Sequence, residues 1–127
     1  MKVRKAIPTD TKAIQLLIKT FPDKLMQDHL PKINAFFIAE EKGAVLGCCA
    51  LDIYSKRIAE IRSLAVSPAA QGKGIATKLI EACVKEAKNK KIYEVLSITG
   101  AEKLFNKHGF GTFQNEKFAL LRILGAK

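Results

Sequence analysis

The residues with the clearest chemical meaning form a glycine-rich turn between an apolar run and an amphipathic helix. The run is IRSLAV, residues 61–66, and the turn is QGKG, residues 71–74. Gly72 and Gly74 permit a tight backbone turn that a Cβ atom would obstruct, and the first N–H groups of the following helix have no partner inside it. These N–H groups and the helix dipole favour an anion. The spacing therefore predicts a phosphate-binding loop.

Two common phosphate-binding motifs do not fit this loop. A P-loop needs Gly-Lys followed by Ser or Thr after a four-residue gap, which this segment lacks. A dinucleotide-binding fingerprint needs a third Gly or Ala where Thr77 stands, and an acidic residue at the end of the next strand. The pattern Gln-x-x-Gly-x-Ala, formed by Gln71, Gly74 and Ala76, fits fully.

The segment QGKGIA resembles the acetyl-CoA pyrophosphate loop of the GNAT superfamily of N-acetyltransferases. The resemblance extends through the following helix to AEKLFNKHGF, residues 101–110, which is similar to the closing A-x-x-L-[YF]-x-K-x-G-F signature of that family. Other segments, among them NAFFIAEEKGAVLGCCAL, resemble the amino-acid N-acetyltransferases of the N-acetylglutamate synthase type. The resemblance covers nearly the whole chain and implies acetyl transfer to an amine.

The resemblance also implies which residues hold acetyl-CoA as co-substrate. In this family two central parallel strands splay apart, and the pantetheine arm pairs with the freed backbone edge, here Leu64, Ala65 and Val66. Phe105 is expected beside the cofactor. The residues expected around the pyrophosphate are Gln71, Gly72, Lys73, Gly74, Ile75, Ala76 and Thr77.

Acetyl transfer to an amine needs a base for the ammonium and a proton for the departing thiolate. Glu60 is the candidate base, because several GNAT enzymes carry a catalytic glutamate on this strand and an apolar setting makes a carboxylate more basic. The alternative is a surface carboxylate or one paired with Arg62 on the same strand face. Phe105 stands where many relatives carry a Tyr that acts as the general acid. The sequence therefore does not identify the group that protonates the departing thiolate. The weaker substitutes are Tyr54, Tyr93 and His108.

A glutamate-like acceptor has two carboxylates, and the planar guanidinium of Arg suits them better than Lys. Arg62, beside Glu60, and Arg122 near the chain end are the candidate substrate residues, although either could form a surface ion pair instead. The leading interpretation is an acetyl-CoA-dependent N-acetyltransferase of a small amino-acid-like amine. The alternatives are a protein or peptide amine acetyltransferase and a non-catalytic acetyl-CoA-binding module.

Local patterns predict the elements that position these residues. Because a helix connects the strand at 58–66 to the next strand, those two are expected to be parallel. The fold class is α/β: a GNAT-type mixed, mostly antiparallel sheet flanked by helices, with splayed central parallel strands. The expected strands are residues 2–6, 35–40, 44–54, 58–66, 93–98, 110–113 and 117–123. The expected helices are residues 8–21, 75–88, 101–107 and a short helix between Pro22 and Pro31, serving as a substrate lid or a connector.

Length and composition place the chain among small cytoplasmic domains. Its 127 residues suit a single domain, 1–127, and no apolar run approaches the ~20 residues that cross a bilayer. The N-terminus MKVRKAIP lacks the apolar core of a secretory signal, so a cytoplasmic protein without a membrane partner is expected.

Cysteine usage and charge narrow the partners further. The three cysteines are expected as reduced thiols, and no zinc site is predicted because the chain lacks a C-x-x-C motif and its two histidines lie far apart. The net charge is +10, but the lysines are scattered rather than gathered with aromatic residues. This pattern indicates a solvated cationic surface and argues against a nucleic-acid partner. A homodimer is compatible with these observations.

Overall fold

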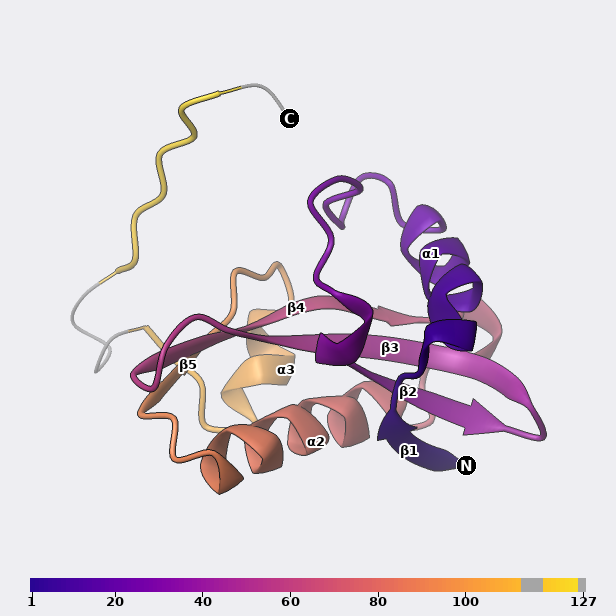
Figure 1. The fold of residues 1–127 in the computed structure, drawn as a ribbon. Coiled ribbons are helices and arrows are strands. Elements are labelled where there is room, and N and C mark those ends of the chain that lie inside the picture. The colour runs from indigo at the N-terminus through magenta and orange to yellow at the C-terminus, as the bar shows by residue number, and fades with distance from the viewer. Residues whose placement is uncertain (113–117, 126–127) are drawn as a thin grey trace.

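A mixed five-stranded sheet forms the centre of the protein, and the computed structural model describes residues 1–112 and 118–125 (Figure 1). The strand order is β1-β2-β3-β4-β5, with β4 and β5 parallel and every other neighbouring pair antiparallel. This confirms the expected fold class. The strands are β1 (Lys2–Lys5), β2 (Phe36–Glu41), β3 (Ala44–Ile53), β4 (Ile58–Val66) and β5 (Glu94–Leu96). The helices are α1 (Thr11–Lys19), α2 (Ile75–Asn89) and α3 (Glu102–Asn106), with 3₁₀ turns at Pro8–Asp10, Ile33–Ala35 and Pro68–Ala70.

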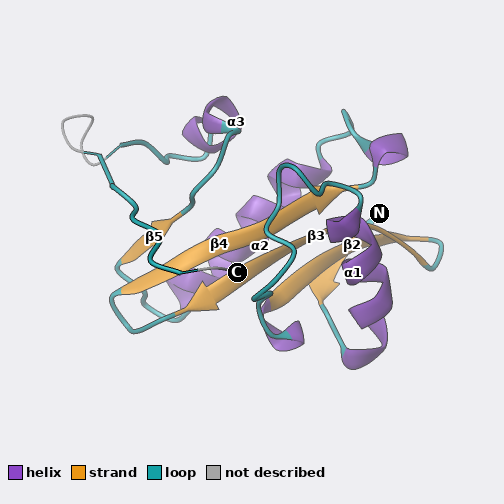
Figure 2. Ribbon diagram, turned by 90° about the horizontal axis from the view of Figure 1, so that it is seen from above, coloured by secondary structure: helices purple, strands orange, loops and turns teal. Residues whose placement is uncertain are grey.

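Helices cover both faces of the sheet: α1 lies on one face, and α2 and α3 lie on the other (Figures 1 and 2). The two longer helices are amphipathic, and each presents its apolar side to the sheet. The middle of β3 is therefore buried on both faces, which explains its nearly continuous apolar sequence. The buried residues of α1 are Ile14, Leu17 and Ile18, and those of α2 are Ile75, Leu79, Ile80, Cys83 and Ala87. Within the described residues, no helix is both long and apolar enough to cross a membrane.

The first turn of α2 lies very close to β3 at Gly47. A Cβ atom at this position would lie 3.1 Å from the carbonyl oxygen of Ala65 and 3.1 Å from side-chain carbons of Ile75 and Leu79. Any larger residue would have to push the helix away from the sheet. Gly47 therefore fixes the distance between the sheet and the N-terminus of α2.

The pairing of β4 differs along its two edges. On one edge, β5 pairs with Ile58, Ala59 and Glu60 only, although β4 continues to Val66. The strands thus separate after Glu60, which confirms the expected splay.

A β-bulge interrupts the opposite edge of β4. The register with β3 passes from Cys48↔Ala65 to Ala50↔Arg62, so β4 uses one residue more than β3 over this stretch. Ser63, inside the bulge, has a left-handed φ of +56°. A bulge of this kind increases the local twist and redirects backbone groups out of the ladder.

The predicted short helix between Pro22 and Pro31 is wrong: the segment forms turns. The side-chain amide of Gln27 donates hydrogen bonds to the carbonyl oxygens of Ile18 and Leu25, each at 3.0 Å. A helix this short is marginal in water, so a side chain that satisfies the freed carbonyl groups favours the turn conformation.

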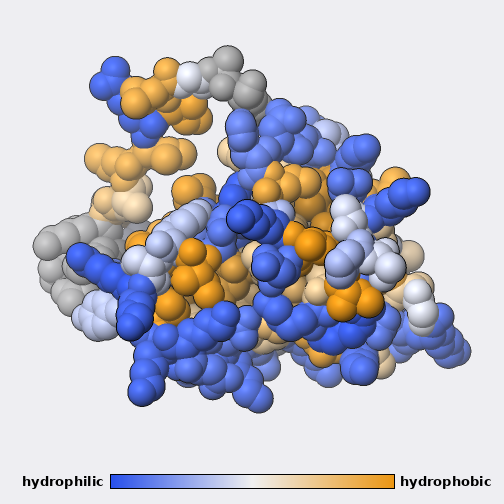
Figure 3. All heavy atoms as spheres, viewed as in Figure 1, coloured by the Kyte–Doolittle hydropathy of each residue, from blue (hydrophilic) through white to orange (hydrophobic). Residues whose placement is uncertain are grey.

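The last two predicted strands are also not formed in the part of the chain that the structure describes. Residues 110–112 and 118–123 have no strand conformation, while Phe113 and Lys117 lie outside the described residues. Large apolar side chains between Phe118 and Leu124 are 71–93% exposed, and this segment extends away from the sheet (Figures 1 and 3). Strand propensity depends on packing against neighbours, and this segment has none of the burial that a strand face supplies.

All three cysteines are buried free thiols, in agreement with the expectation of reduced residues. The Sγ atoms of Cys49 and Cys83 are 3.7 Å apart, which connects β3 to α2. Burial raises the pKa of the Cys48 thiol to about 12.

A half-buried ionic network joins β1, β2 and the start of α1. Arg4 donates to both carboxylate oxygens of Asp10, at 2.9 and 3.1 Å, and to Glu40 at 3.0 Å. The carboxylate of Asp10 also accepts a 2.8 Å hydrogen bond from the N–H of Ile7. The hydrogen bond from Arg4 is the main cause that lowers the pKa of Asp10.

We expect Asp10→Asn to destabilise the protein at pH 7 by about 1–3 kcal/mol, the usual value for hydrogen bonds to a charged group. Because folding lowers the pKa of Asp10, its contribution is present above the unfolded value of about 3.9 and disappears as pH falls through the folded value. The variant should therefore lose less stability than the wild type between about pH 5 and pH 2. Urea unfolding at pH 7, 5 and 3 measures this difference. The exposed Asp23, replaced by Asn, is the control, and equal pH profiles for Asp10→Asn and wild type would contradict the assignment.

Candidate functional site

The glycine loop has the conformation that an anion-binding turn requires. Gly72 and Gly74 have φ values of +80° and +79°, in the region that favours glycine. The side-chain amide of Gln71 donates to the carbonyl oxygen of Val66 at 3.1 Å and thus braces the turn against the end of β4. The first intrahelical bond of α2 runs from the N–H of Lys78 to Gly74 at 3.2 Å. The N–H groups that precede it, those of Ile75, Ala76 and Thr77, have no partner within the helix and remain available to a ligand.

The backbone edge of β4 leads from this loop toward the middle of the sheet. The hydroxyl of Ser97 donates to the carbonyl oxygen of Ile61 at 3.2 Å, and beyond this contact no described strand pairs with that edge as far as Val66. Leu64 and Val66 are half-buried, and Ala65 is 3% exposed. The stretch that β5 leaves unpaired, from Ile61 to Val66, spans about 17 Å at the usual rise of a strand. Its length and shape suit an extended chain that adds as a strand.

Four polar side chains gather on the sheet face that carries α1, where β3 ends and β4 begins. Asp52 lies directly opposite Glu60 in the register. Arg62 donates to Asp52 at 3.0 Å, and the hydroxyl of Tyr54 donates to Glu60 at 2.5 Å. We call these residues, Asp52, Tyr54, Glu60 and Arg62, the acid–arginine cluster. Because strand side chains alternate, Ala59 and Ile61 turn toward α2 and leave this face to the charged residues.

Arg62 does not pair with Glu60, contrary to the alternative considered from the sequence. Its second terminal nitrogen donates to the carbonyl oxygen of His29 at 2.9 Å, so the guanidinium connects β4 to the loop at residues 21–35. The Arg62 side chain is 20% exposed. A guanidinium carries five N–H donors, which leaves some of them for a ligand.

The surroundings of Glu60 are polar rather than apolar as expected, because Tyr54, Asp52 and Arg62 all lie on its face. Within the described residues, Glu60 forms no ion pair. Burial, followed by the hydrogen bond to Glu60, raises the pKa of Tyr54 to about 12. The phenol therefore stays protonated at neutral pH and donates to the carboxylate.

Other predicted site residues lie elsewhere. Phe105 is 4% exposed and packs edge-to-face against Phe110, with ring centroids 5.2 Å apart, so its cofactor contact stays a prediction. Arg122 is exposed and forms no ion pair with any residue that the structure describes. It does not lie beside Arg62, the other candidate substrate residue. Tyr93 is 82% exposed. His108 lies against the outer side of α2 together with Glu81, Val84, Lys85 and Lys88.

Sequence reasoning missed Asp52 and treated Tyr54 only as a weak proton donor. The sequence contained a signal for both. Asp52 and Tyr54 are two residues apart and therefore lie on the same face of the strand. The short turn at residues 54–57 sets the hairpin register that brings Asp52 opposite Glu60. The bulge at Ser63 has no comparable signal, since serine rarely adopts a positive φ.

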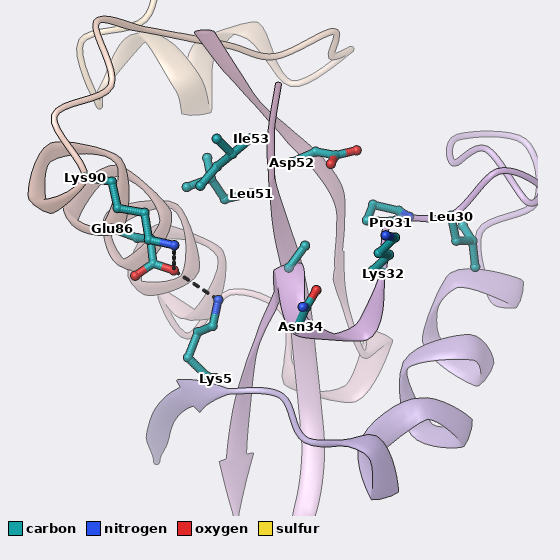
Figure 4. A pocket seen from close by; sticks show the side chains of 11 residues that line it. Lys5, Leu30, Pro31, Lys32, Asn34, Leu51, Asp52, Ile53, Glu86 and Lys90 are labelled. Atoms are coloured by element: carbon teal, nitrogen blue, oxygen red, sulfur yellow. Dashed lines mark hydrogen bonds and ion pairs between the residues drawn. The ribbon is translucent and has the colours of Figure 1, made fainter. Parts of the chain in front are cut away.

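A hollow of about 480 Å³ lies near the C-terminal end of α2, at the opposite end of this helix from the glycine loop (Figure 4). Lys5 forms a 3.0 Å ion pair with Glu86 on its wall, and Lys90 lies 3.9 Å from the same carboxylate. Asp52 belongs to both this hollow and the acid–arginine cluster. Among the described residues, no group of three His, Cys, Asp or Glu side chains is arranged to hold a metal ion.

Residues 7–110 match the Acetyltransferase (GNAT) family. The chain belongs to this family. A curated relative, the amino-acid acetyltransferase of Mycobacterium tuberculosis, is 30% identical over 85% of this chain and 67% of its own length. This GNAT protein therefore has its sequence relatives among N-acetyltransferases.

Two solved structures share the fold of this GNAT protein. A Mycobacterium tuberculosis protein in complex with CoA and the ligand NLQ is 30% identical, with a TM-score of 0.84, covering 89% of this chain and 73% of that one. The N-acetylglutamate synthase of Neisseria gonorrhoeae, complexed with coenzyme A and N-acetyl-glutamate, is 26% identical, with a TM-score of 0.74, covering 85% of this chain and 27% of that one. These likenesses confirm the predicted family type.

We expect Gly74→Ala to weaken CoA binding at least tenfold, because a Cβ atom disfavours the left-handed backbone that directs the loop. Gly43→Ala is a matched control: Gly43 has a φ of +82° in the turn between β2 and β3, and a Cβ there also meets nothing within 4 Å. Both variants carry the same backbone strain, but only one lies in the loop. Calorimetry with CoA, alongside thermal unfolding, measures both. Equal CoA affinity of the two folded variants would show that the loop is not part of the CoA site.

Proposed function

We propose that this GNAT acetyltransferase transfers an acetyl group from acetyl-CoA to the amine of a small amino-acid-like acceptor. One observation carries the proposal: β4 has a free backbone edge between the acid–arginine cluster at one end and the glycine loop at the other. An extended cofactor on that edge would lie with its anionic part at the loop and its other end near Glu60.

The proposed cofactor contacts follow from the backbone groups available. The N–H groups at the start of α2, with those of the loop, receive the pyrophosphate, and the lysine-rich surface adds a favourable field. The β4 edge at Leu64, Ala65 and Val66 pairs with the pantetheine arm. This recognition uses backbone groups, so the apolar side chains of β4 remain free to pack in the core.

The proposed chemistry is direct transfer in a ternary complex. Glu60 accepts a proton from the acceptor ammonium, the neutral amine attacks the thioester carbonyl, and a C–N bond forms as the C–S bond breaks. Backbone N–H groups freed by the bulge at Ser63 are candidates to polarise the carbonyl. The attacking nitrogen loses a second proton as the C–S bond breaks, and because Phe105 has no proton to give, this proton reaches the thiolate through water.

The acceptor class rests on two supports. The relatives include an amino-acid acetyltransferase and an N-acetylglutamate synthase. Arg62, half-buried beside Glu60, keeps N–H donors that suit an acceptor carboxylate. The phenylalanine at position 105 is the observation that favours the alternative, a module that binds acetyl-CoA without turnover.

A substrate screen separates these functions. CoA thiol release is followed with acetyl-CoA and each of glutamate, glutamine, a monocarboxylic amino acid, a polyamine and a lysine peptide. Turnover with free amino acids is expected. Turnover only with the peptide would favour a protein acetyltransferase, and tight acetyl-CoA binding without any turnover would favour the non-catalytic module.

We expect Glu60→Gln to keep acetyl-CoA affinity and to lower kcat by roughly 10²–10⁴ near pH 7, because the amide cannot accept the ammonium proton. The loss should shrink as pH rises and more of the acceptor becomes neutral. Steady-state kinetics from pH 6 to 9 test this, with Glu81→Gln on the exposed side of α2 as the control. A turnover rate equal to that of the wild type in Glu60→Gln would show that Glu60 is not the base and would favour a bound water in that role.

We expect Arg62→Lys to raise KM for a dicarboxylic amino acid far more than for a monocarboxylic one, since Lys cannot reproduce two parallel N–H bonds. The expected discrimination is about 1.5–3 kcal/mol. Because Arg62 also holds the carbonyl of His29, thermal unfolding of the variant separates loop loosening from lost recognition. Equal KM changes for both acceptors would discard Arg62 as the carboxylate ligand.

A further inference from the structure

The β3–β4 hairpin holds a tyrosine against the candidate base. The N–H of Tyr54 donates to the carbonyl oxygen of Ile58 at 3.1 Å, which fixes the backbone of Tyr54 at the start of the turn. From this anchor its hydroxyl reaches the Oε1 atom of Glu60 at 2.5 Å. The contact is thus built from one short hairpin and does not depend on a mobile loop.

The two carboxylates of the acid–arginine cluster have different partners. Asp52 and Glu60 lie directly opposite each other, where like charges are unfavourable. Arg62 neutralises Asp52 through a 3.0 Å ion pair, whereas the only hydrogen bond found for the Glu60 carboxylate within the described chain comes from the neutral Tyr54 hydroxyl. One oxygen of Glu60 therefore has no donor among the described residues.

The terminal torsion of a glutamate side chain is broad, so an unrestrained carboxylate rotates among many orientations. We propose that Tyr54 is a positioning residue that holds one oxygen of Glu60 and presents the other to the acceptor ammonium. This inference rests on the proposed role of Glu60 as base. It gives a function to a tyrosine other than the one that the family resemblance implies at position 105, where this chain has Phe.

The test is Tyr54→Phe, which removes only the hydroxyl from a side chain that is 54% exposed. We expect kcat to fall roughly tenfold to a hundredfold, the loss of one hydrogen bond to a charged group, with KM for acetyl-CoA unchanged. A loss in kcat with an unchanged KM separates an effect on the base from an effect on cofactor binding.

Two comparisons show whether Tyr54 acts through Glu60. Tyr93→Phe is the matched control, since Tyr93 is the only other tyrosine and is 82% exposed. Tyr54→Phe is also made in the Glu60→Gln background, where it should cause no further loss of residual turnover. Thermal unfolding of each variant confirms that it is folded.

A fall in kcat with unchanged KM for acetyl-CoA, absent from the Glu60→Gln background, supports the proposal. A wild-type kcat in Tyr54→Phe overturns it and leaves Glu60 as base. An equal loss in both backgrounds also overturns it, because Tyr54 would then act on the thiolate or the acceptor directly. A fully active Glu60→Gln protein is a separate result that rejects the proposed base itself.

Discussion

The edge of β4 that β5 leaves unpaired after Glu60 is the constraint on which the rest of the site depends. A backbone edge left without partners is costly unless water or a ligand satisfies it. Here the edge opens because β5 stops at Leu96 while β4 runs to Val66. The glycine loop begins where that edge ends, and Gln71 connects the two through the carbonyl oxygen of Val66. Strand edge and helix start thereby form one continuous surface of backbone donors and acceptors.

Tight packing elsewhere keeps this surface in place. Gly47 brings the first turn of α2 against β3, so the loop cannot shift without moving the helix. On the other face, Arg62 reaches from β4 to the loop that follows α1, and Gln27 organises that loop internally. The two faces serve different purposes. One carries the apolar core beneath α2, whereas the other combines a packed helix with a half-buried polar cluster suited to a charged acceptor.

The sequence was sufficient wherever a local rule decides the structure. The glycine turn before α2, the 3.6-residue period of α2 and the parallel crossover to β5 are all local or topological properties, and each was predicted correctly. The prediction was wrong where tertiary contacts decide, as in the turns around Gln27 and the residues after Phe118. The pair of Arg62 with Asp52 depends on the hairpin register, which places Asp52 opposite Glu60 and next to Arg62. A pair of Arg62 with Glu60 was the alternative considered from the sequence, and the structure shows the cross-strand partner Asp52 instead.

The burial of the three thiols has a consequence for a protein that handles a thioester. A thiolate exposed near acetyl-CoA exchanges with it and would retain the acetyl group as a cysteine thioester. Cys48, Cys49 and Cys83 are each 0% exposed, and the pKa of Cys48 is raised to about 12. None of the three thiols is accessible in the folded state, and Cys48 is also held in its protonated form. The core thus keeps these thiols from reaching a bound thioester.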